Sequence, residues 1–138
     1  KLQAKDKLNA CNIKTMPYPG FPTDMQPIMG AVLGVSKGTS LIVENIFENR
    51  YKYLAELKRM GAKTTVEGKT AIIKGIRRYT PAKVEATDLR GGAALILAAL
   101  NAGGTTEITN IKYILRGYEK IDKKLEMLGA NINIREGE

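Results

Sequence analysis

The order of apolar and polar residues predicts a chain of alternating helices and strands. Apolar residues at helical spacing fill 25–35 and 89–102, and each stretch follows a Thr-Asp pair and ends near a glycine. Short strands are expected next, in "TSLIVE" from Thr39 and in "TTEIT" from Thr105. A second helix then follows in each half, closed by a glycine; its apolar positions are Tyr53, Leu57 and Met60 in one half and Ile121, Leu125 and Leu128 in the other.

The two halves of the chain are copies of one unit. Thr23-Asp24 recurs as Thr87-Asp88 at a separation of 64 residues, and further landmarks recur in the same order at separations of 66 and 68 residues. These landmarks are Gly38-Thr39 with Gly104-Thr105, Arg50 with Arg116, and Leu57, Met60, Gly61 and Ala62 with Leu125, Leu128, Gly129 and Ala130. We therefore interpret residues 1–138 as a single partial domain, with repeat unit one at 12–75 and repeat unit two at 82–138.

The two units differ at their ends. Unit one finishes in a hairpin, "KTTVEGKTAIIKG", in which Gly68-Lys69 suits a two-residue turn. Unit two stops at "ANINIREGE", so its last strand is missing. An open sheet edge of this kind is usually paired or covered. We expect the chain to be a piece of a larger protein, or another segment to complete the sheet.

Composition narrows the chemistry that the chain can perform. It has no histidine, which removes the commonest general base and the commonest metal ligand, and Cys11 is its one cysteine, which we expect to be idle. A formal net charge of +8 suits a phosphorylated metabolite, a nucleic acid or a membrane surface as partner. No apolar run approaches the roughly 20 residues of a membrane span and no signal peptide opens the chain, so we expect a cytoplasmic protein without membrane contact.

Asp24 lies in a proline-rich stretch, "PYPGFPTDMQP", directly before a predicted helix. Two interpretations are open. Asp24 is the N-cap of that helix, with a carboxylate that accepts backbone N–H groups. Alternatively, Thr23 is the cap and Gln26 closes a capping box, which leaves the Asp24 carboxylate free to meet a substrate.

Three arginines are candidate anion ligands because a guanidinium grips a carboxylate or a phosphate in a bidentate way. Arg50 and Arg116 are equivalent in the two units. Arg90 stands in the first turn of a predicted helix, where a cation opposes the helix dipole unless an anion binds there. The alternative for each is a surface ion pair, for instance with Glu48 or Glu119.

Several strings of the sequence, in this order, resemble the C-terminal part of the UDP-N-acetylglucosamine 1-carboxyvinyltransferases: "PYPGFPTDMQ", "ENIFENRY", "ELKRMGA", "EATDLRGGAALILAAL" and "RGYEKIDKKLEMLGA". These enolpyruvyl transferases open peptidoglycan synthesis. The resemblance implies an α/β fold of repeated βαβαββ units, an inside-out α/β barrel, of which this chain holds about two of the three units of one domain. It also implies that the first residues of the full protein cross over to complete that domain.

The resemblance assigns roles to single residues. Asp24 matches the aspartate thought to take the proton from the 3'-hydroxyl of UDP-N-acetylglucosamine as it attacks phosphoenolpyruvate. Ile46 matches a position whose backbone contacts the UDP-sugar. Arg90 and Arg116 match arginines that hold the phosphate and carboxylate of phosphoenolpyruvate, and Arg50 matches another near the site. The implied partners are these two substrates and the remainder of the enzyme chain, with no cofactor, no metal and no nucleic acid.

The chain also departs from the family pattern. Leu115 stands where the family commonly has an aspartate before "RGYE". The family's N-terminal lysine and its loop cysteine lie in segments that this chain does not contain, and Cys11 does not match that cysteine. We therefore expect the chain alone to transfer no enolpyruvyl group. The alternative function is a non-catalytic basic module that binds RNA or another anionic partner.

Overall fold

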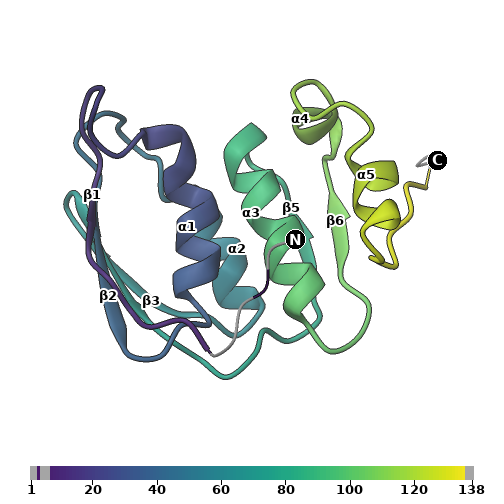
Figure 1. Cartoon of the computed structure of the whole chain (residues 1–138), viewed down its shortest axis with the longest axis horizontal. Coiled ribbons are helices and arrows are strands. Elements are labelled where there is room, and N and C mark those ends of the chain that lie inside the picture. The colour runs from purple at the N-terminus through teal and green to yellow at the C-terminus, as the bar shows by residue number, and fades with distance from the viewer. Residues whose placement is uncertain (1–2, 4–6, 136–138) are drawn as a thin grey trace.

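The computed structural model describes residue 3 and residues 7–135 as an α/β structure with two sheets (Figure 1). In chain order its elements are β1 (Ile13–Lys14), the 3-10 helix η1 (Thr23–Met25), α1 (Gln26–Leu33), β2 (Thr39–Val43), α2 (Lys52–Arg59), β3 (Lys63–Glu67), β4 (Thr70–Lys74), β5 (Lys83–Glu85), α3 (Leu89–Asn101), β6 (Glu107–Thr109), α4 (Lys112–Leu115) and α5 (Ile121–Met127). Each half of the chain thus runs through a strand, a helix, a strand and a further helix.

The larger sheet has the strand order β1-β2-β4-β3. The pair β1–β2 is parallel and the other two pairs are antiparallel, with Ile42 of β2 opposite both Ile13 and Ala71. Ile42, Ala71 and Ile73 point to one face and are fully buried, whereas Leu41 on the other face is 37% exposed. The four-stranded sheet therefore faces helices on one side only.

Helices α1, α2 and α3 lie between the two sheets. Figure 1 shows α1, α2 and α3 side by side next to the four-stranded sheet, followed by the parallel pair β5–β6, with α5 at the far end. α3 packs against both α1 and α2, so the helices of the two halves form one layer. This arrangement brings the N-terminal ends of α1 and α3 close to each other, and the candidate site lies there.

Two tyrosines fill the core between the helices. Tyr53 is fully buried and donates to Gln26 Oε1 at 2.9 Å, and Tyr79 is 2% exposed and donates to the backbone oxygen of Ala31 at 2.8 Å. Gly30 and Gly34 on α1 make room for them, since a Cβ at either glycine would collide with a tyrosine hydroxyl. Burial raises the pKa of both phenols because it disfavours the charged form.

Most of the predicted elements are confirmed, with differences at their ends. The helix expected over 25–35 begins at Gln26 after a 3-10 turn and ends at Leu33, and the helix expected over 89–102 runs from Leu89 to Asn101. The hairpin turn is confirmed, with Gly68 at a φ of +56°. Gly61 and Gly129 close α2 and α5 with φ values of +88° and +96°, as expected for glycines after a helix.

The second half carries no strand over residues 131–135. The last three residues of "ANINIREGE" lie outside the described residues. Among the described residues, no helix combines the length and the apolar character that a bilayer crossing requires.

Candidate functional site

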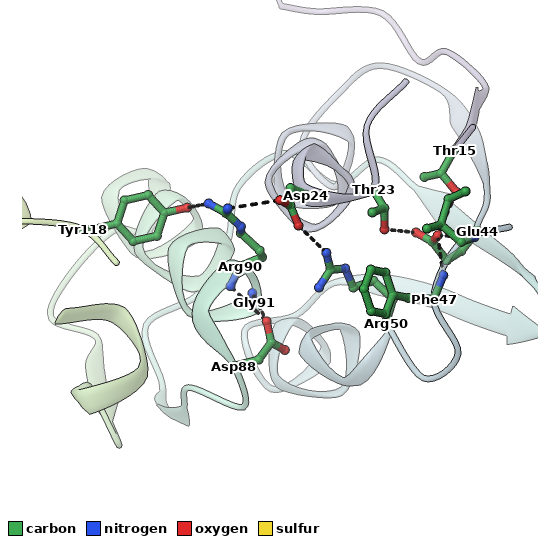
Figure 2. A network of polar contacts seen from close by, with 11 residues as sticks. Thr15, Thr23, Asp24, Glu44, Phe47, Arg50, Asp88, Arg90, Gly91 and Tyr118 are labelled. Atoms are coloured by element: carbon green, nitrogen blue, oxygen red, sulfur yellow. Dashed lines mark hydrogen bonds and ion pairs between the residues drawn. The ribbon is translucent and has the colours of Figure 1, made fainter. Parts of the chain in front are cut away.

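Among the residues that the structure describes, two arginines and no backbone amide hold the Asp24 carboxylate (Figure 2). Its Oδ1 accepts from Arg50 at 2.7 Å and its Oδ2 accepts from Arg90 at 3.1 Å. The Asp24 side chain is nevertheless 56% exposed. Asp24 therefore presents a charged and accessible carboxylate between two guanidinium groups that come from different halves of the chain.

Both capping interpretations of this stretch are wrong. Neither η1 nor α1 has a side-chain cap, and the residues at their cap positions are Pro22 and Met25. The donors that an Asp24 cap would use are absent, because the Gln26 amide donates to the Thr23 carbonyl and Pro27 has no amide hydrogen. The capping box also fails, since Gln26 is fully buried against Tyr53.

Asp88, the equivalent residue of the second half, is a helix cap. Its Oδ1 accepts from the Arg90 amide at 2.9 Å and from the Gly91 amide at 2.8 Å. Its Oδ2 accepts from Thr87 Oγ1 at 3.1 Å. The carboxylate of Asp88 is thus occupied by its own helix, whereas that of Asp24 is free for another use.

Arg50 reaches Asp24 from the turn that precedes α2. The backbone enters this turn through Asn49 at a φ of +56°, a conformation that asparagine tolerates better than most residues. The guanidinium carbon of Arg50 lies 4.8 Å from the centre of the Phe47 ring, within range of a cation–π contact. With a side chain only 14% exposed, Arg50 is the more enclosed of the two arginines.

Arg90 reaches Asp24 from the first turn of α3. Its second donor meets the Tyr118 hydroxyl at 3.1 Å, and its side chain is 32% exposed. The hydrogen bond to Tyr118, together with the negative charge of Asp24, raises the pKa of Arg90. These partners offset the helix dipole that opposes a cation at this position. Arg50 and Arg90 thus form ion pairs with Asp24 rather than with Glu48 or Glu119.

Arg116 does not join this group. It follows α4 as an exposed residue, and its guanidinium lies 5.6 Å from the centre of the Tyr113 ring. No ion pair found among residues 7–135 includes it. The structure therefore places Arg50 and Arg90 together at Asp24 and leaves Arg116 two residues from Tyr118.

Ile46 lies in the loop after β2, beside a groove of about 410 Å³. The groove is lined by residues 44–49, Tyr51, Gly68 and Lys69. Ile46 is 42% exposed, and its backbone amide donates to Glu44 Oε1 at 2.9 Å. The loop thus offers a surface next to Asp24, Arg50 and Arg90. Glu44 holds the backbone of this loop in place.

Sequence reasoning missed Glu44 and Tyr118. Glu44 is 3% exposed and binds four donors, and Tyr118 binds Arg90. The signal for Glu44 was the alternation of β2, which puts Ser40, Ile42 and Glu44 on one buried face. In the described part of the chain, no group of three Asp, Glu, Cys or His side chains could hold a metal ion, and Cys11 is exposed.

The chain matches a known protein family over nearly its whole length. The profile of the EPSP synthase (3-phosphoshikimate 1-carboxyvinyltransferase) family matches residues 1–137. The chain belongs to this family of enolpyruvyl transferases.

Relatives within the enolpyruvyl transferases are similar over most of this chain. The UDP-N-acetylglucosamine 1-carboxyvinyltransferase of Desulfofundulus thermocisternus is 57% identical over 132 residues, which are 96% of this chain and 54% of that protein. The UDP-N-acetylglucosamine 1-carboxyvinyltransferase 1 of Caldanaerobacter subterraneus is 57% identical over 123 residues, which are 89% of this chain and 30% of that protein. The chain thus spans between about a third and about half of the length of these relatives.

Solved enolpyruvyl transferases share the fold. The crystal structure of the enolpyruvyl transferase NikO from Streptomyces tendae superposes with a TM-score of 0.84 at 29% identity, covering 93% of this chain and 30% of NikO. EPSP synthase from Acinetobacter baumannii superposes with a TM-score of 0.69 at 15% identity, covering 92% of this chain and 29% of that one. The chain therefore has the enolpyruvyl transferase fold, and it corresponds to about 30% of the length of those proteins.

Proposed function

We propose that this chain forms part of an enolpyruvyl transferase that acts on UDP-N-acetylglucosamine. The reaction moves the enolpyruvyl group of phosphoenolpyruvate to the 3'-hydroxyl of the sugar and releases phosphate, as the first committed step of peptidoglycan synthesis in the cytoplasm. High identity to carboxyvinyltransferases of this substrate class supports the choice of substrate. The same identity favours the transferase over the RNA-binding alternative.

The observation that carries the proposal is the exposed carboxylate of Asp24, which pairs with two arginines instead of capping a helix. A general base needs an accessible lone pair within reach of the substrate hydroxyl. Asp24 is 56% exposed, and within the described part of the chain its oxygens accept only from guanidinium groups, so one lone pair of each oxygen is still available. In this proposal Asp24 takes the proton of the 3'-hydroxyl while the sugar oxygen bonds to C2 of phosphoenolpyruvate.

The arginines supply fixed positive charge beside this carboxylate. The addition passes through a tetrahedral intermediate that carries both a phosphate and a carboxylate, so preorganised cations stabilise charge where it develops. Arg90 points at Asp24 from one side and Arg50 from the other. We assign Arg90 and Arg116 to the phosphate and carboxylate of phosphoenolpyruvate, and Arg50 to the rim of the same site.

The UDP-sugar occupies the groove beside this charge cluster in the same proposal. The loop around Ile46 lines the groove. In this proposal the backbone of Ile46 contacts the UDP-sugar. Because Ile46 and Phe47 are both exposed, the loop offers apolar surface as well as backbone groups to the ligand. The sugar then lies between Ile46 and the carboxylate of Asp24.

Asp24→Asn tests the proposal in a complete enzyme. The test protein is the Caldanaerobacter subterraneus relative in which this chain replaces the matching segment. Asparagine keeps the shape of the side chain and one oxygen for an arginine, but it cannot accept the proton. We expect phosphate release to slow by a factor of about 10² to 10⁴, while KM for both substrates changes little.

Asp122→Asn is the matched control. Asp122 stands in the first turn of α5, and no ion pair of the described residues includes it. The control should keep the turnover of the parent chimera. Near-normal turnover of Asp24→Asn would reduce Asp24 to a residue that merely orders Arg50 and Arg90, and the proposed role as base would be wrong.

A further inference from the structure

A buried carboxylate lies beneath the candidate site. Glu44 directly follows β2 on the buried face of that strand and is 3% exposed. No ion pair in the described part of the chain supplies a cation to it. A buried charge without a counter-ion needs hydrogen-bond donors, because transfer out of water disfavours the ionised form.

The donors to Glu44 are Thr15, next to β1, and two segments of the candidate site, the loop after β2 and η1. Its Oε1 accepts from the amides of Ile46 at 2.9 Å and of Phe47 at 3.1 Å, and from Thr15 Oγ1 at 2.8 Å. Its Oε2 accepts from Thr23 Oγ1 at 3.1 Å. Figure 2 shows Glu44 between Thr15 and Thr23, with Asp24 next to Thr23.

These contacts reach both parts of the candidate site. The first segment is the loop 45–47, whose side chains are all exposed, so burial alone does not fix its backbone. The second segment is η1, which has no side-chain cap and holds Asp24 directly after Thr23. Phe47 in turn lies under the guanidinium of Arg50.

We propose that Glu44 is a positioning residue that sets the substrate loop 45–47 and the turn of Asp24 together. This proposal rests on the proposed function for the role of the loop in UDP-sugar binding. Oε1 fixes the loop, Oε2 fixes the turn, and the rigid carboxylate keeps the distance between them constant. Hydrogen bonds to a charged acceptor are the stronger kind, which suits this task.

Three variants of the chimera separate the two arms of Glu44, which are the hydrogen bonds of Oε1 to the loop amides and the hydrogen bond of Oε2 to Thr23. Glu44→Ala removes both arms. Glu44→Gln keeps the shape and one oxygen, so it retains acceptance from the loop amides. Thr23→Val removes only the Oε2 arm and leaves the loop amides bonded. Each variant is measured for KM of both substrates, for kcat and for amide hydrogen exchange of a peptide that covers residues 44–49.

The expected results differ between the variants. Glu44→Ala raises KM for UDP-N-acetylglucosamine by about tenfold or more, lowers kcat and speeds exchange at Ile46 and Phe47. Glu44→Gln restores both the KM and the protection to near the parent values. Thr23→Val lowers kcat while KM for the sugar and the protection of the loop stay unchanged.

Two outcomes would overturn the proposal. One is a Glu44→Ala variant that unfolds more readily but has normal KM and normal loop protection, which means that Glu44 only supports the fold. The other is a Glu44→Gln variant as impaired as Glu44→Ala. A parent chimera without enolpyruvyl transfer would reject the proposed function instead, and the exchange rates alone would then decide whether Glu44 anchors the loop.

Discussion

Alanine at Asp88 should weaken the fold, whereas alanine at Asp24 should not, once salt is present. The two aspartates are equivalent in the two halves of the chain, but only Asp88 accepts backbone amides, at 2.9 and 2.8 Å. Removal of an N-cap side chain lowers the free energy of unfolding by about 1 kcal/mol, within a range of about 0.5 to 2. We expect this loss for Asp88→Ala and almost none for Asp88→Asn, since asparagine caps a helix as well as aspartate does.

Asp24→Ala removes ion pairs instead. Asp24 is 56% exposed, and pairs of this kind contribute about 0 to 1 kcal/mol each. Salt separates the two effects, because the Debye length falls to about 3 Å at 1 M ionic strength. The effect of Asp24→Ala should therefore vanish in 1 M NaCl, while the hydrogen bonds lost in Asp88→Ala leave a deficit there.

Urea unfolding of the chain, followed by circular dichroism at low and at high NaCl, measures these differences. The unfolding midpoint of Asp88→Ala should shift at both salt concentrations, and that of Asp24→Ala only at the lower one. Equal losses for the two alanine variants in 1 M NaCl would mean that Asp24 also caps a helix. An unchanged Asp88→Ala variant would refute the cap of α3.

Two further predictions concern activity and pH. The purified 138-residue chain alone should release no phosphate from phosphoenolpyruvate and UDP-N-acetylglucosamine, and detectable release would contradict this. Burial raises the pKa of Tyr51 to about 12, and it also raises the pKa of Tyr53 and of Tyr79 above the ordinary value of 10.0. As the pH rises above 10, the unfolded chain loses phenolic protons before the folded chain does, so the free energy of unfolding should fall. Each buried tyrosine lowers it by up to about 1.4 kcal/mol per pH unit, and the fall with pH should be less steep in Tyr79→Phe.

The sequence was informative where a local pattern decides the structure. The helical spacing before Asn101 and the glycines after α2 and α5 are local signals, and the elements they predict are present. The strand β1 has two residues and β5 has three, so their existence depends on the partner strands β2 and β6. The sequence predicted β6, which also has three residues, but gave no strand at β1 or β5.

The candidate site was only partly predictable. The repeat makes Arg50 and Arg116 equivalent, yet Arg50 bonds to Asp24 and Arg116 lies apart beside Tyr113. The two arginines make different contacts because Asp88, the aspartate of the second half, already accepts backbone amides of its own helix. Contacts across the two halves, such as Arg90 to Asp24, depend on how α3 packs against α1, which the order of residues does not reveal.

Pro27 explains why the two equivalent aspartates have different surroundings. In the second half, the residue three positions after the aspartate is Gly91, whose amide Asp88 accepts. In the first half that position is Pro27, which has no amide hydrogen to offer. The remaining donor, the amide of Gln26, is used by the carbonyl of Thr23. A single proline thus keeps the Asp24 carboxylate out of the helix backbone, and Arg90, held at the start of a well-capped helix, can reach across to it.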